Sequence, residues 1–123
     1  MTRTTEKYSI KLQIMSENHI AMGPGKADLL EAIQETGSIA AAGRAMSMSY
    51  KRAWDLVEIM NVCFSNPLVN KSKGGAGKGG ATLTSLGCTV LNQYRALQLK
   101  SHNAIENDID TFIDLLKTDI TDK

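Results

Sequence analysis

The sequence is short of cysteine, histidine, proline and aromatic residues, and the first two shortages exclude whole classes of protein. The two cysteines, Cys63 and Cys88, stand 25 positions apart without a CxxC motif, and His19 and His102 are isolated. Structural zinc sites and disulfide frameworks need clustered or regularly spaced residues of these types. We therefore expect both cysteines to be small core residues, and we expect neither a metal nor another cofactor.

Long apolar runs are missing as well. No segment offers the roughly 20 consecutive apolar residues of a membrane span, and residues 1–15 alternate polar with apolar residues, unlike a signal peptide. We expect a cytoplasmic protein with no membrane partner. A chain of 123 residues, 42% apolar and 22% charged, has the size and composition of one soluble domain.

The glycine-rich stretch SKGGAGKGGATLT, residues 72–84, fits no nucleotide-binding loop. A P-loop requires GxxxxGK followed by Ser or Thr. With Gly77 and Lys78 as its GK, Ser72 stands where the first glycine belongs and Gly79 where the hydroxyl belongs. The dinucleotide template GxGxxG matches, but strand-like ATLT follows it in place of a helix. No catalytic constellation is found elsewhere, so we expect a protein that is not an enzyme.

The net charge of +1 hides an uneven distribution. Residues 1–100 carry 12 Lys and Arg against 7 Asp and Glu, whereas residues 101–123 carry 2 against 6. Clustered cations are the electrostatic footprint of nucleic-acid binding, and the total charge alone would conceal it. The sequence therefore indicates a basic body with an acidic end.

Apolar periodicity predicts an α+β fold in which helix predominates. YSIKLQI, residues 8–14, alternates as a half-buried strand does. After the GPG break, the spacing changes to that of a helix, which we expect to run for about ten residues from Lys26. Gly37 is placed to end this helix.

Residues 38–61, SIAAAGRAMSMSYKRAWDLVEIMN, predict two helices joined by a tight turn. Ser38 and Ser49 are expected to cap them, because a serine hydroxyl accepts a backbone N–H that the helix start leaves unpaired. The stripe of the second helix that we expect to face the core consists of Tyr50, Ala53, Trp54, Val57 and Met60.

The second helix begins with Ser49, Tyr50, Lys51 and Arg52. The free N–H groups and the macrodipole of a helix N-terminus favour anions, and helix-turn-helix proteins reach base edges with this part of their second helix. An ordinary solvated helix start with two surface cations has the same residues. Both interpretations stay open on these residues alone.

Two short strands are predicted at residues 68–72 and 81–84, joined by the glycine-rich loop. Lys71, Lys73 and Lys78 flank this hairpin. Glycines allow a backbone to approach a phosphodiester chain closely, and lysines neutralise its charge. The pattern indicates the wing of a winged helix, although a surface loop without a function can have the same composition.

From Thr84, which is placed as an N-cap, residues 85–117 contain no proline and predict a long helix. Such a helix is longer than the diameter of a small domain. Its apolar face therefore needs a partner, either a second copy around a two-fold axis or its own domain, reached by folding back as a helix hairpin. The apolar stripes are Leu86, Val90, Leu91, Tyr94 and Leu97, then Ile105, Ile109, Phe112, Ile113 and Leu116.

These stretches resemble the N-terminal DNA-binding domain of the ModE family of molybdenum-dependent transcriptional regulators, a domain similar to the winged helix-turn-helix of LysR-type regulators. The most specific motifs are SYKRAWD, residues 49–55, and GKGGATLTSLG, residues 77–87. The resemblance implies a winged helix-turn-helix DNA-binding domain over residues 1–83, a helical dimerisation segment over 84–117 and a tail over 118–123.

The resemblance further implies a transcriptional regulator that binds double-stranded DNA as a homodimer on an inverted repeat. Family members continue into molybdate-binding domains, and because this sequence ends at Lys123 we expect no direct molybdate binding. An alternative is a winged-helix protein-interaction module that partners a separate sensor or regulator. The DNA-binding residues that the resemblance assigns are Ser49, Tyr50, Lys51 and Arg52 on the recognition helix and Lys73 and Lys78 on the wing.

Overall fold

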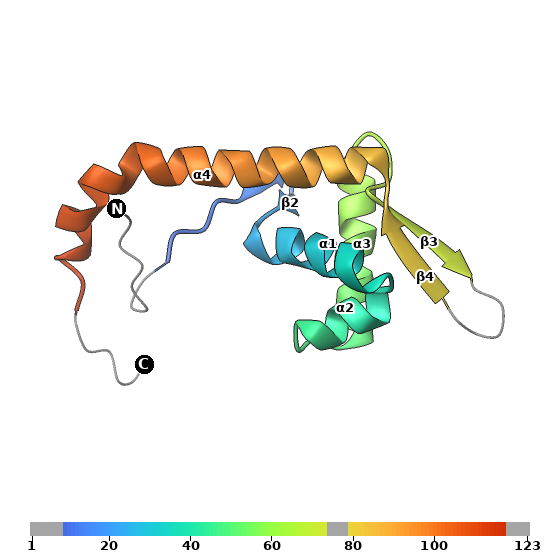
Figure 1. Ribbon diagram of the computed structural model, residues 1–123. Coiled ribbons are helices and arrows are strands. Elements are labelled where there is room, and N and C mark those ends of the chain that lie inside the picture. The colour runs from blue at the N-terminus through green and yellow to red at the C-terminus, as the bar shows by residue number, and fades with distance from the viewer. Residues whose placement is uncertain (1–8, 74–78, 118–123) are drawn as a thin grey trace.

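The computed structural model describes residues 9–73 and 79–117, which form a helical body, two small hairpins and one long projecting helix (Figure 1). The mostly helical α+β class predicted from the sequence is confirmed. In chain order the elements are β1 (Ile14–Ser16), β2 (His19–Met22), α1 (Pro24–Thr36), α2 (Ile39–Ala45), α3 (Tyr50–Cys63), β3 (Val69–Lys73), β4 (Gly79–Leu83) and α4 (Ser85–Ile113).

The strand predicted over residues 8–14 is wrong for all but its last residue among those described. Residues 9–13 belong to no strand, and β1 begins only at Ile14. The Leu12 carbonyl accepts a hydrogen bond of 2.6 Å from the Tyr94 hydroxyl of α4, so a side chain satisfies the backbone where a neighbouring strand was expected. Strands β1 and β2 form an unpredicted antiparallel hairpin that turns at Glu17, whose φ is 55°.

The first helix starts at a proline and ends at a glycine. Pro24 occupies its first turn, two positions before the predicted start, where a missing N–H costs nothing. Gly37 ends it as predicted, with a left-handed φ of 79° and its N–H donating to the Ile33 carbonyl at 2.8 Å. The left-handed conformation also turns the Gly37 carbonyl outward, where it becomes an acceptor for another element.

Helices α2 and α3 form the predicted helix-turn-helix. The hydroxyls of Ser38 and Ser49 each accept the backbone N–H three residues further on, at 2.9 and 3.0 Å, so both predicted caps are confirmed. A β-carbon on Gly43 would lie 3.2 Å from the Ala53 β-carbon, so the two helices touch through their smallest side chains. The largest buried side chains of the core are Met22, Leu29, Leu30, Ile33, Val57, Met60, Leu68, Val69 and Tyr94.

The two cysteines are less buried than predicted. Cys63 and Cys88 are free thiols of intermediate exposure, and neither belongs to the buried cluster that α1, α3 and the hairpins enclose. Cys88 instead accepts a weak contact from the Gln34 amide at 3.8 Å.

Helix α4 runs without a break through the polar residues 101–103, so the alternative of a fold-back hairpin over residues 84–117 is contradicted. Thr84 caps it as predicted. Leu91 and Tyr94 are buried, but from residue 95 to residue 117 no residue is. Figure 1 shows this second part extending beyond the helical body. No helix within residues 9–73 and 79–117 combines the length and the apolar character needed to cross a membrane.

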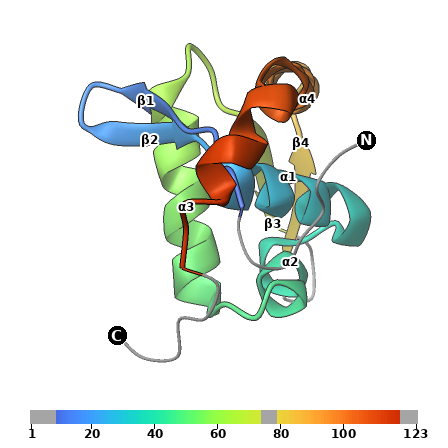
Figure 2. The ribbon, with the colours of Figure 1, turned by 90° about the vertical axis from the view of Figure 1, so that its left-hand side faces the viewer.

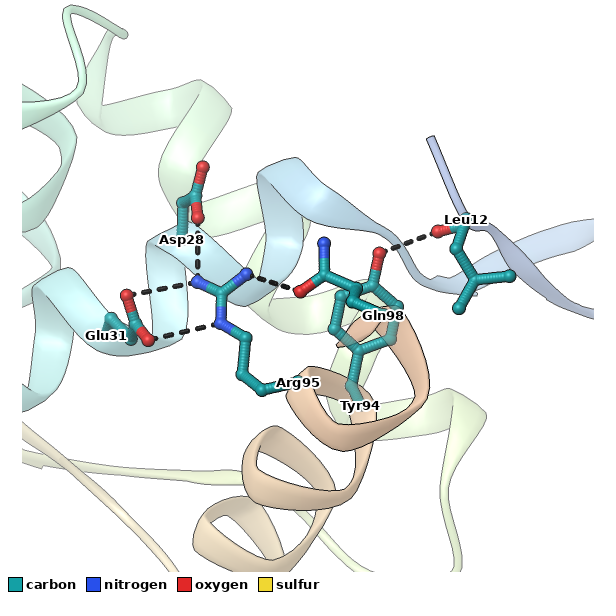
Figure 3. Close-up of polar contacts among 6 residues, drawn as sticks. All are labelled: Leu12, Asp28, Glu31, Tyr94, Arg95 and Gln98. Atoms are coloured by element: carbon teal, nitrogen blue, oxygen red, sulfur yellow. Dashed lines mark hydrogen bonds and ion pairs between the residues drawn. The ribbon is translucent and has the colours of Figure 1, made fainter. Parts of the chain in front are cut away.

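Arg95 joins α4 to α1 near the point where α4 leaves the body (Figure 3). Its guanidinium donates to Asp28 at 2.7 Å and to Glu31 at 3.1 Å on α1, and to Gln98 at 2.9 Å on its own helix. Partial burial opposes the charge, but the hydrogen bonds to Glu31 and Asp28 outweigh it and raise the pKa of Arg95 above its usual value. The guanidinium therefore stays charged and connects α1 with α4.

The close approach of α4 to the residue before β3 generates a test of the fold. A β-carbon on Gly87 would collide with the Leu68 carbonyl, so Gly87→Ala should lower the free energy of unfolding by about 1–3 kcal/mol through overpacking. The matched control is Gly25→Ala in the first turn of α1, where nothing lies within 4 Å and alanine should be neutral or stabilising. Urea denaturation followed by circular dichroism measures both, and equal stabilities would contradict the packing described here.

Candidate nucleic-acid interface

The N-terminus of α3 is the most exposed cationic helix start in the described part of the chain. Ser49 uses its hydroxyl oxygen to accept the Arg52 N–H, while the Tyr50 side chain remains 54% exposed and that of Lys51 84% exposed. Arg52 is also exposed. A 14-residue helix presents its free N–H groups and the positive end of its dipole here, beside two cationic side chains, and this combination attracts anions.

The two cations at this helix start have different surroundings. Lys51 donates to Asp55 one turn later at 2.9 Å, a solvent-exposed pair that another anion can displace. Arg52 lies near Lys26 of α1: partial burial lowers the pKa of Lys26, and repulsion from the Arg52 guanidinium lowers it further. The sequence did not indicate this neighbour, because no local pattern brings the first turn of α1 to α3.

The hairpin of β3 and β4 corresponds to the predicted wing. It is positioned by the side chain of Asn61 near the end of α3. Its Oδ1 accepts the backbone N–H groups of Leu68 at 2.8 Å and Val69 at 3.1 Å, and its Nδ2 donates to the Val69 carbonyl at 3.3 Å. Two residues further along β3, Lys71 pairs with Glu58, which precedes Asn61 on α3. Strand β3 therefore runs along α3 toward the N-terminus of that helix.

The returning strand β4 is held from another direction. The Ala81 N–H donates at 2.9 Å to the Gly37 carbonyl, the acceptor that the left-handed end of α1 exposes, and the Thr84 N–H donates at 2.9 Å to Leu68. Figure 2 shows the wing on one side of α3 and the hairpin of β1 and β2 on the other. The base of the wing is thus attached to both α1 and α3, which leaves it little freedom to change its angle.

An aromatic pair lies between the wing and the helix start. Trp54 packs against the core but is only half-buried, so it lies at the margin of the core and not inside it as predicted. The Lys71 ammonium lies 4.1 Å from the centroid of its ring. The Tyr50 ring follows, with its centroid 5.9 Å from that of Trp54.

Four of the six residues that the sequence assigned to DNA binding lie together at the start of α3, namely Ser49, Tyr50, Lys51 and Arg52. Lys73 is the last residue of β3, and Lys78 lies outside the described residues. The contacts of these six residues with DNA remain predictions. Asn61, which sets where the wing lies relative to the helix, was not among them.

Known proteins with similar sequences are mostly ModE regulators. The chain is 33% identical over 103 residues to the molybdenum transport protein ModE of Azotobacter vinelandii, covering 84% of this chain and 38% of that protein. It is 32% identical over 102 residues to the DNA-binding transcriptional dual regulator ModE of Escherichia coli K12, covering 80% and 39%. It is also 40% identical over 85 residues to the molybdenum-pterin-binding protein MopB of Rhodobacter capsulatus, covering 69% and 32%.

The chain therefore spans less than two fifths of the length of these relatives. Among solved structures, a LysR family transcriptional regulator superposes with a TM-score of 0.51 at 17% identity, over 68% of this chain and 27% of the other. At this identity the likeness concerns the fold alone. No family model matches the sequence.

The role assigned to Asn61 can be measured directly. Asn61→Ala should lower the free energy of unfolding by about 2 kcal/mol or more, because the N–H groups of Leu68 and Val69 lose their side-chain acceptor at about 1–3 kcal/mol each. Asn66→Ala, which changes an exposed residue of the loop between α3 and β3, is the matched control and should change stability by less than about 0.5 kcal/mol. Chemical denaturation of both variants is the measurement, and equal midpoints would show that Asn61 does not hold the wing.

Proposed function

By homology over most of its length the chain belongs to the ModE family of transcriptional regulators, and from that premise we propose that it binds double-stranded DNA and regulates transcription as a homodimer on an inverted repeat. The names of several relatives refer to molybdenum. Because this chain spans less than two fifths of their length, molybdenum binding is not carried over to it.

The observation that carries the proposal is the direction of β3. The hydrogen bonds of Asn61 and the ion pair of Glu58 with Lys71 lead the strand along α3 toward its exposed N-terminus. A recognition helix in the major groove and a wing on the flanking backbone need this shared direction. The exposed Lys51 and Arg52 side chains leave the helix start open to a duplex.

The proposed contacts divide into two kinds. Tyr50, Lys51 and Arg52 reach base edges, where each good bidentate contact discriminates by about 1–3 kcal/mol. Lys73 and Lys78 contact phosphates, which adds affinity that does not depend on sequence.

The exposed apolar side chains of α4 beyond Tyr94 support the homodimer. Leu97, Leu99 and Phe112 are 46%, 61% and 58% exposed in the single chain, and exposed apolar side chains in this number favour an interface. The charge of the helix is also polarised. Residues 85–100 carry two cations and no acid, whereas residues 101–113 carry three acids and no cation.

Two recognition helices related by a two-fold axis read half-sites about 34 Å apart, one turn of the duplex. Selection of bound fragments from random duplex DNA tests the proposal as a whole. Enrichment of a palindromic sequence is expected. Failure to retain any duplex at about 50 mM salt, where phosphate contacts are strong, would reject DNA binding and favour a protein-interaction module.

Arg52→Ala should weaken binding to the selected site by about 5- to 150-fold, because one bidentate base contact is worth about 1–3 kcal/mol. The circular dichroism spectrum should stay unchanged, since the side chain is exposed. Lys100→Ala on α4 removes an exposed cation far along the chain and serves as the control. Fluorescence anisotropy on the selected duplex compares the two variants, and equal affinities would remove Arg52 from the interface.

Phe112→Glu should raise the dissociation constant of the homodimer about tenfold to hundredfold, because a buried phenylalanine contributes about 1.5–3 kcal/mol. Val62→Glu changes an apolar side chain on α3 that is 74% exposed and should leave the dimer intact. Sedimentation equilibrium of both variants gives the constants. A wild-type protein that stays monomeric at high concentration would contradict the α4 interface.

A further inference from the structure

Lys71 on β3 is already bound to side chains of α3. The Lys71 ammonium forms an ion pair with the Glu58 carboxylate and lies over the Trp54 ring, 4.1 Å from its centroid. The side chain of Lys71 is 29% exposed and that of Glu58 46% exposed. By sequence, Lys71 is one of three lysines near the glycine-rich loop; by structure, its charge is neutralised within the chain.

The position of this pair relates it to the proposed DNA surface. Trp54 lies one turn before Glu58 on α3, and Tyr50 one turn before Trp54, with the two rings 5.9 Å apart. The row of Glu58, Lys71, Trp54 and Tyr50 therefore leads to the exposed helix start. A Lys71 side chain released from Glu58 can turn along this row toward a phosphate, whereas in the paired arrangement Glu58 and DNA compete for the same ammonium.

We propose that Glu58 and Trp54 withhold Lys71 from the DNA backbone, so that this cation adds little to sequence-independent affinity. The inference rests on the proposed function, since it concerns the same interface. Each lysine that neutralises a phosphate strengthens binding to every duplex alike. An acid that holds one lysine back therefore lowers the affinity for every duplex by about the same factor, and Glu58 becomes a determinant of the sequence-independent part of binding and of its salt dependence.

The salt dependence of binding separates this role from an ordinary stabilising ion pair. Every phosphate neutralised contributes a slope of about −0.9 to the logarithm of the association constant against the logarithm of salt concentration. Glu58→Gln keeps the size of the side chain and removes its charge. Between 50 and 200 mM salt, its affinity for a random-sequence duplex should fall roughly 3.5-fold more steeply than that of the wild type, which is the effect of one added phosphate contact.

Two further variants complete the experiment. The first is Lys71→Ala and the second is the double variant Glu58→Gln with Lys71→Ala. Their salt-dependence slopes should equal each other and that of the wild type, because the wild-type Lys71 releases no counterions from the DNA. Glu35→Gln on α1, an exposed acid, controls for the change in net charge and should leave the slope unchanged.

Each result decides the matter. A steeper slope for Glu58→Gln that disappears in the double variant supports the proposal. A slope for Glu58→Gln equal to that of Glu35→Gln, or an increase that persists without Lys71, overturns it while leaving DNA binding intact. A wild-type protein that binds no duplex at about 50 mM salt overturns the proposed function and this inference with it.

Discussion

The arrangement of the candidate interface depends on one side chain, the amide of Asn61. It is the donor and acceptor that joins the end of α3 to the start of β3, through three hydrogen bonds to Leu68 and Val69. A carboxamide is suited to this place because it offers an acceptor and a donor at fixed separation to an N–H and a C=O of one strand. Without it, the wing would be joined to α3 only by the short connection between them and by side chains at its edges.

The cationic side chains of the fold and of the candidate interface have different roles in spite of their similar chemistry. Arg95 is saturated by Asp28 and Glu31 and acts within the fold. Lys51 and Arg52 are exposed at the helix start, and Lys71 is held by Glu58. A count of lysines and arginines therefore overstates the charge available to an anion, and the surroundings of each cation decide its effect.

Local features were predictable from the sequence, and features that depend on distant contacts were not. The caps at Ser38, Ser49 and Thr84 and the left-handed Gly37 follow from backbone chemistry within four residues, which a sequence displays directly. The alternation over residues 8–14 failed because a strand also needs a partner, and none lies beside residues 9–13. Asn61, Lys26 and Lys71 each interact with a residue of another element. The periodicity of the sequence does not predict such contacts.

The anchoring of α4 at Arg95 makes the rest of that helix a lever. From Arg95 to Ile113 the helix is continuous and measures about 27 Å along its path at about 1.5 Å per residue, it bends toward its C-terminal end (Figure 1), and no residue along it is buried. A tilt of about 5° at the anchor would therefore move the far end by up to about 2 Å. In a homodimer joined through the projecting parts of α4, small changes in the packing of Asp28 and Glu31 around the Arg95 guanidinium would produce larger changes in the distance between the two helical bodies.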